Sequence, residues 1–134
     1  MKELFVWNQT YELGIQTIDE QHKKWLGIMN KLYNSFVKKE ASDKVLSIIK
    51  EMEDYTIYHF SSEERFFKQF GFIQESAHLK LHNDFKLELK KLKTEYEKSP
   101  LSLTYKLMTF MQTWLRAHIL EADKQYVSLL KGKI

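Results

Sequence analysis

The chain contains His59-Phe-Ser-Ser-Glu63 and His78-Leu-Lys-Leu-His82, two stretches that each place two potential metal ligands four residues apart. Four residues are just over one turn of an α-helix, so each pair should project from one helix face, about 6 Å apart along the axis. The other two histidines are His22, which precedes these stretches, and His118, which Asp123 follows five residues later. The pattern predicts a metal cluster held between facing helices.

Length and composition narrow the class of protein. A chain of 134 residues can bury one core, so we expect a single domain over residues 1–134. The absence of cysteine excludes disulfides and Fe–S clusters, and a metal would need nitrogen and oxygen ligands. The net charge of +3 is spread along the chain, so nucleic acid is not an expected partner. Residues 1–7 contain no long apolar stretch and no cleavage site, and no apolar run approaches the length of a membrane span, so we expect a cytoplasmic location.

The spacing of apolar residues predicts the fold. One proline and four glycines leave few breaks, which favours long helices. After an N-terminal extended arm at residues 1–16, apolar residues recur at steps of three and four. This periodicity predicts four helices: one opening at a Thr17-Ile-Asp-Glu20 capping box, then 42–70, 74–98 and 102–130, with a break at Ser99-Pro100. The expected fold is all-α, an antiparallel up-down-up-down four-helix bundle.

The predicted ligands should lie at the same level along the axis of the bundle. In an antiparallel bundle, the second half of the second helix faces the first half of the third, so His59 and Glu63 should meet His78 and His82. His22 lies early in the first helix, and His118 and Asp123 lie late in the fourth, which puts them at the same end. We therefore expect one site with ligands from all four helices.

Asp123 meets this site only under one condition. Five residues correspond to about 140° around a regular helix, which would turn Asp123 away from the face of His118 and into solvent. A π-bulge between the two residues would bring Asp123 back. The sequence therefore predicts local π-helical winding near residues 118–123 if Asp123 is a ligand.

The ligand set indicates the kind of metal. Taken alone, His59 and Glu63 could be an ordinary pair one helical turn apart. Five imidazoles and two carboxylates are, however, too many for one ion and too rich in nitrogen for calcium or magnesium. Two six-coordinate ions need about twelve positions, and these groups with a solvent-derived bridge leave one open. An open position favours a small diatomic ligand, and iron fits best, with manganese and cobalt as open alternatives.

The chain resembles the haemerythrins, in particular the single-domain bacterial haemerythrins. The resemblance rests on Trp7-Asn8, Gly14-Ile-Gln-Thr-Ile-Asp-Glu-Gln-His22, His59-x3-Glu63, His78-x3-His82 and Trp114-Leu-Arg-Ala-His118-Ile-x3-Asp123. It implies a non-haem di-iron centre with a bridging oxo or hydroxo group that binds O2 reversibly. By the same resemblance, His78, His82 and His118 would hold the coordinatively filled iron, His22 and His59 the iron with the vacancy, and Glu63 and Asp123 would bridge them.

Apolar residues beside the ligands are candidates for the pocket wall. Trp25 lies one turn after His22, and Trp114 lies one turn before His118, so both should keep water from the site. Ile119 is a further candidate for the O2 pocket, and Leu26 and Phe60 are weaker ones. Glu121, three residues after His118, could lean toward the metals or face water.

The resemblance implies an O2 carrier, store or delivery protein rather than an enzyme. One alternative is a di-iron redox enzyme, although the Glu-x-x-His form of ferritin-like sites occurs only at Glu75-Ser-Ala-His78. A second alternative is an oxygen- or iron-sensing module, since such domains are commonly fused to output domains in this family. A third is a metal-free helical bundle. We expect a monomer, with O2 as ligand and an unidentified protein partner left open.

Overall fold

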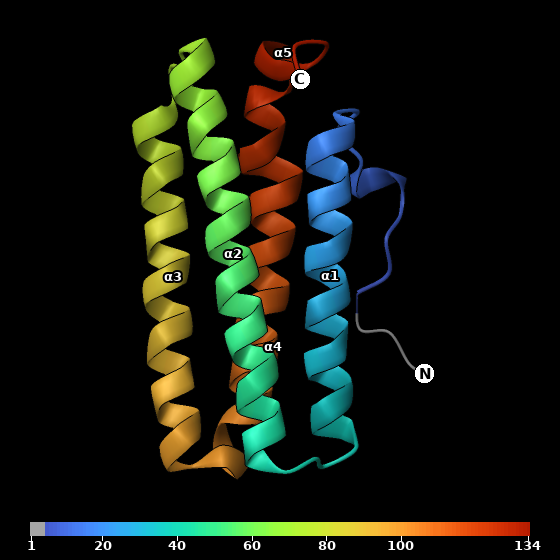
Figure 1. Ribbon diagram of the computed structural model, residues 1–134, viewed down its shortest axis with the longest axis vertical. Helices are drawn as coiled ribbons and strands as arrows, with labels where there is room; N and C mark the ends of the chain where they lie inside the picture. The colour runs from blue at the N-terminus through green and yellow to red at the C-terminus, as the bar shows by residue number, and fades with distance from the viewer. Residues whose placement is uncertain (1–4) are drawn as a thin grey trace.

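The computed structural model describes the backbone of residues 5–134 and the side chains of residues 5–99 and 106–134. In this part of the chain, four long helices lie side by side and run in alternating directions (Figure 1). The described residues form no strands. None of these helices combines the length and the apolarity needed to cross a membrane. The helices are α1 (Gln16–Val37), α2 (Ser42–Phe70), α3 (Glu75–Lys98) and α4 (Pro100–Ala117). The prediction of an all-α, up-down-up-down four-helix bundle is confirmed.

The fourth helix changes its winding near its end. After α4, the chain forms a π-helical turn at His118–Ala122, a 3-10 turn at Asp123–Tyr126 and the short helix α5 (Val127–Leu130). Figure 1 shows this stretch continuing α4 toward the end of the bundle where α2 passes to α3. The segment predicted as one helix over 102–130 is therefore continuous in direction, but it starts at Pro100 and is not uniformly α-helical.

The start of α1 differs from the prediction. The helix begins at Gln16 with Ile15 at the N-cap, and no side chain caps it, so the capping box predicted at Thr17 is wrong. The Asp19 carboxylate instead accepts hydrogen bonds from the backbone N–H groups of Leu13 at 2.9 Å and Gly14 at 3.1 Å. A buried carboxylate in the first helical turn is thus satisfied by the segment before the helix, which it fixes in place.

The segment before α1 packs against the bundle. It includes a 3-10 helix at Gln9–Tyr11, and the backbone of the buried Phe5 exchanges two hydrogen bonds of 2.8 Å with the Asn30 side chain of α1. The predicted arm began at residue 1, and its first four residues lie outside the described part of the chain.

The turns between helices follow from glycine and proline chemistry. Gly71 ends α2 with a φ of 70° in the left-handed region, where a Cβ would be strained, and its N–H bonds to the Phe67 carbonyl at 2.9 Å. At the opposite end, α3 stops at Lys98 and Pro100 opens α4, because proline disfavours helical geometry in the residue before it.

Apolar side chains fill one half of the bundle. We call this half the apolar end; it lies where α1 passes to α2 and α3 to α4, and its buried core is Leu32, Val45, Ile48, Ile49, Met52, Leu89, Leu92, Tyr96 and Leu107. At the far tip of the other half, a second apolar cluster comprises Leu13, Ile15, Ile18, Phe67, Tyr126 and Leu130. The predicted ligands lie between these two clusters along the bundle axis.

Candidate metal centre

All seven predicted ligands meet inside the bundle. α1 supplies one, α2 and α3 supply two each, and the π-helical turn and the residue after it supply the last two. Each ligand is at least 97% buried; they are His22, His59, Glu63, His78, His82, His118 and Asp123. We call this half of the bundle the histidine end.

The seven side chains form two overlapping groups. In one group, Glu63, His78, His82 and His118 bring one ligand atom each within 4.8 Å of one another. In the other group, His22, His59, Glu63 and Asp123 do the same. Because Glu63 belongs to both, the groups adjoin, and the arrangement has room for two ions that share a carboxylate.

The π-helical turn aims Asp123 inward. The backbone N–H of Asp123 bonds to the carbonyl of His118, five residues earlier, and this wider turn takes up the extra residue. The prediction of π-helical winding before Asp123 is confirmed. Its Oδ1 lies 3.0 Å from Nε2 of His78 and 3.0 Å from Nε2 of His118, and its Oδ2 lies 3.1 Å from Nε2 of His22. The two oxygens of Asp123 therefore face different histidines.

Two of the imidazoles present a bare nitrogen to the centre. Nδ1 of His59 is 2.7 Å from Oε1 of Gln21, and Nδ1 of His82 is 2.9 Å from Oε2 of Glu64. An acceptor oxygen at this distance requires the proton on Nδ1, so Nε2 of each neutral ring carries a lone pair. Nε2 of His59 lies 3.1 Å from Nε2 of His22 and 3.5 Å from Oε1 of Glu63, and Nε2 of His82 lies 3.1 Å from the same Glu63 oxygen.

The facing acceptors fit a cation. Buried atoms without a hydrogen-bond partner gather here; those that face the centre include Glu63 Oε1, Asp123 Oδ1 and Oδ2, and the Nε2 atoms of His78, His82 and His118. A buried acceptor without a donor is costly, and several that face one another repel. Positive charge between them would remove both penalties. Imidazole nitrogen with carboxylate oxygen is a donor set for transition metals rather than for calcium or magnesium.

The protonation of the site agrees with this role. Burial lowers the pKa of His59 to about 3, and burial together with the nearby His118 lowers the pKa of His82 to about 3. Burial would raise the pKa of Asp123, but His118, His22 and His78 outweigh it and hold that pKa well below its usual range. Near neutral pH, His59 and His82 are thus neutral and Asp123 is ionised, which are the forms that bind metal.

Large aromatic side chains cover the imidazoles. Phe60 stacks on His82 with ring centres 3.7 Å apart and planes 4° apart, and Trp114 stacks on His118 at 4.2 Å and 15°. Trp25 is fully buried, 5.3 Å from the His59 ring. The other candidates for the pocket wall, Ile119 and Leu26, are buried in the same apolar cluster as Trp25.

Three residues that hydrogen-bond to predicted ligands were not predicted from the sequence. Gln21 and Glu64 contact His59 and His82, as described above, and the Tyr126 hydroxyl donates to Oε2 of Glu63. Burial together with Asp123 and Glu63 raises the pKa of Tyr126 well above its usual value, so the hydroxyl stays a donor. Gln21 and Glu64 each adjoin a predicted ligand in sequence, which was a usable signal. Tyr126 lies one turn after Asp123 and had only its position as a signal.

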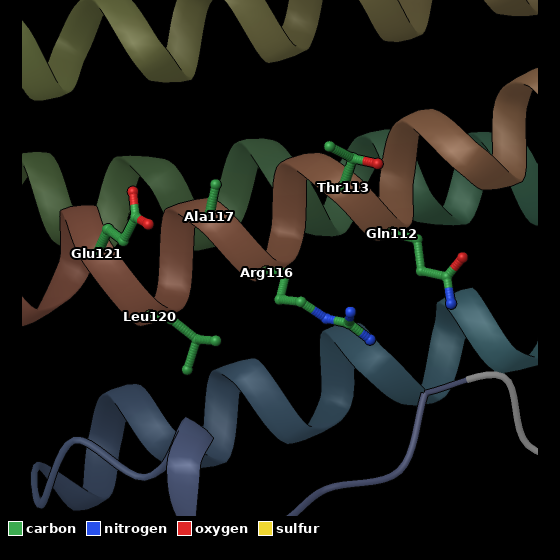
Figure 2. A pocket seen from close by; sticks show the side chains of 6 residues that line it. All are labelled: Gln112, Thr113, Arg116, Ala117, Leu120 and Glu121. Atoms are coloured by element: carbon green, nitrogen blue, oxygen red, sulfur yellow. The ribbon is translucent and has the colours of Figure 1, made fainter.

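Glu121 lies outside the cluster. Its side chain is exposed and lines a surface pocket of about 460 Å³ with Gln112, Thr113, Arg116, Ala117 and Leu120. Figure 2 shows Gln112, Arg116 and Leu120 pointing toward α1, whereas Glu121 points away from it. The structure therefore favours the water-facing alternative for Glu121, and this pocket contains none of the seven predicted ligands.

Comparisons with known proteins identify the family. A family model described as the Hemerythrin HHE cation binding domain matches residues 13–130. A Bacteriohemerythrin from Clostridium acetobutylicum is 35% identical over 130 residues, covering 92% of this chain and 99% of the relative. One from Pseudomonas aeruginosa strain PAO1 is 29% identical, covering 94% and 81%. A crystal structure of wild-type hemerythrin shares the fold at a TM-score of 0.87 and 23% identity, covering 96% of this chain and 99% of that one. The chain belongs to the haemerythrin family.

Proposed function

We propose that this protein binds O2 reversibly at a non-haem di-iron centre, as a carrier, store or delivery protein. The observation that supports this best is the set of imidazole nitrogens and carboxylate oxygens that lie close together in the buried centre, several of them without a hydrogen-bond partner. Such a set is destabilising without a cation and well suited to two. Family membership favours iron as the metal.

The two groups of side chains suggest how the ions would be shared. In our proposal, His78, His82 and His118 hold one iron, and His22 and His59 hold the other. Glu63 and Asp123 bridge the pair; the distances of the Asp123 oxygens to His22 on one side and to His78 and His118 on the other support this role. Three histidines against two would leave the open coordination position on the His22 and His59 side.

The surroundings of the site favour binding over turnover. Bound iron would supply the electrons that O2 needs to bind and take them back on release. The chain would contribute exclusion of water: Trp25, Phe60 and Trp114 enclose the imidazoles with apolar surface. A dry site slows side reactions with water and external reductants. The Tyr126 hydroxyl, by donating to Glu63, would hold that carboxylate in one orientation.

Anaerobic loading with ferrous iron tests the proposal. We expect two irons per chain, and an optical absorption band that appears in air and fades when argon replaces the air. Two irons that oxidise without a reversible band would contradict O2 carriage and favour a redox enzyme or a sensor. Fewer than two irons would contradict the ligand assignment, and the Asp123→Ala variant would show whether Asp123 contributes.

A further inference from the structure

Two of the five imidazoles are hydrogen-bonded, through the nitrogen remote from the centre, to a side chain on a neighbouring helix. Gln21, the residue before His22 in α1, accepts the hydrogen bond from Nδ1 of His59. Glu64, the residue after Glu63 in α2, accepts the hydrogen bond from Nδ1 of His82. Metal-binding histidines usually donate their second N–H in this way, and the partner sets the tautomer and the ring orientation.

We propose that Gln21 and Glu64 are positioning residues that act on two different metal positions and make them unequal in affinity. Gln21 serves the position of His22 and His59, and Glu64 serves the position of His78, His82 and His118. This inference rests on the two-metal site proposed above, although not on O2 as its ligand.

Gln21 is fixed in the orientation that the metal requires. Its side chain is buried, its Nε2 donates to the buried Ser62 hydroxyl at 3.2 Å, and its backbone carbonyl accepts from Tyr55 at 3.0 Å. A rotated amide would point its N–H groups at Nδ1 of His59, and the imidazole proton would move to Nε2. Metal on Nε2 needs the proton on Nδ1, so only the observed orientation suits a bound ion.

Glu64 differs from Gln21 in charge. Its side chain ends in a carboxylate rather than a neutral amide, and it is partly exposed, with 28% of the side chain accessible. The His82 ring is also clamped by the stacked Phe60. A carboxylate behind an imidazole makes it a stronger electron donor than a neutral amide does. The position with three histidines thus has the stronger outer partner as well, and we expect it to fill first.

Titration of the metal-free protein with Co²⁺ under argon tests the proposal. Cobalt absorption and calorimetry should resolve two steps of one ion each. Glu64→Gln should weaken the first step 10–100-fold and leave the second unchanged; Gln21→Leu should weaken the second step by a similar factor. Gln21→Glu, which places a carboxylate behind His59, should strengthen the second step. The control is Glu51→Gln, which removes an exposed carboxylate of α2, the helix that also carries Glu64, where Glu51 pairs with Lys31 of α1.

A second measurement needs no metal. Nitrogen NMR of the histidine rings in the metal-free protein should show His59 and His82 protonated on Nδ1, and Gln21→Leu should produce a tautomer mixture at His59 alone. Variants that weaken both steps equally, or wild-type rings protonated on Nε2, would overturn the inference. Unequal cobalt steps that respond as expected, in a protein whose iron form lacks a reversible O2 band, would support the inference and contradict the proposed function.

Discussion

The two ends of the bundle use the same helices and the same apolar periodicity, but they bury opposite kinds of side chain. At the apolar end, residues such as Leu32, Ile49 and Leu92 are at most 1% exposed and bury only hydrocarbon. At the histidine end, equivalent inward positions carry His59, Glu63 and other groups, also fully buried. Burial stabilises the first set by about 25 cal/mol per Å² and penalises the second until partners are found.

The difference indicates which half of the molecule a bound ion would stabilise. Protein contacts alone satisfy the hydrocarbon side chains in the core of the apolar end, because packing needs no counter-charge. Several ligand atoms of the histidine end have no hydrogen-bond partner within the described chain. The apolar end should therefore set the stability of the metal-free protein, and the histidine end should make that stability depend on pH and metal.

Acidification should have the largest effect, because it destabilises the histidine end and leaves the apolar end unchanged. His59 and His82 have pKa values of about 3 in the folded protein against 6.5 when unfolded, so the unfolded state binds more protons between these limits. The free energy of unfolding of the metal-free protein should fall as pH falls from 6.5 toward 3, by about 1.4 kcal/mol per pH unit for each histidine. Unfolding in denaturant at pH 7, 6, 5 and 4 measures it.

Two other buried groups, His78 and Asp123, do not reverse the predicted loss of stability at low pH. The pKa of His78 is raised because Asp123 and Glu63 outweigh the lowering by burial, so its stabilising contribution is complete below 6.5. The pKa of Asp123 lies well below 3.8, so its contribution is lost only at the acid extreme. A free energy of unfolding that stays constant between pH 7 and pH 4 would contradict the buried neutral state of His59 and His82.

Metal loading should stabilise the histidine end without changing the apolar end. At a free metal concentration 1,000 times the dissociation constant, one site adds about 4 kcal/mol to the free energy of unfolding. Leu92→Ala, at the apolar end, should remove about 2–5 kcal/mol from both forms and leave the increment from metal unchanged. Denaturant unfolding of the four samples gives the comparison. A smaller metal increment in Leu92→Ala would mean that the two ends are coupled.

The sequence predicted which side chains meet in the buried centre better than it predicted what surrounds them. Helix spacing and the antiparallel order were enough to bring His22, His59 and His118 to one height, because topology alone sets that height. Asp123 required a π-helical turn, and the five-residue interval indicated it. Gln21 and Tyr126 were missed because a single hydrogen bond between helices leaves no periodic signal. The capping box failed because Asp19 found partners in the preceding segment.

His82→Leu tests the contrast between the two ends, because it replaces one buried polar side chain of the histidine end with an apolar one. In the metal-free protein, the bare Nε2 of His82 faces Oε1 of Glu63 at 3.1 Å, which is repulsive. Leucine would remove that contact and keep packing against Phe60, so we expect the free energy of unfolding to rise by about 1–3 kcal/mol. Iron content should drop below two per chain. A destabilised metal-free variant with full iron content would contradict the assignment of His82.

Thr56→Val should change the stability of the protein least. It tests whether a buried polar group that has hydrogen-bond partners behaves differently from one that has none. Thr56 is a buried polar residue near the site, but the protein satisfies it: its hydroxyl accepts from Nε1 of Trp25 at 3.1 Å and donates to the Met52 carbonyl at 2.7 Å. Valine has the same shape and would leave the indole N–H of Trp25 without a partner, which costs about 1 kcal/mol. Because no metal is involved, the loss should be equal in metal-free and loaded protein, as for a residue of the apolar end. Thermal unfolding of both forms measures this loss. His82→Leu is expected to stabilise the metal-free protein. If Thr56→Val did the same, burial of any polar group would be enough to explain the contrast between the two ends. The absence of hydrogen-bond partners for the predicted ligands would then not be the cause of that contrast.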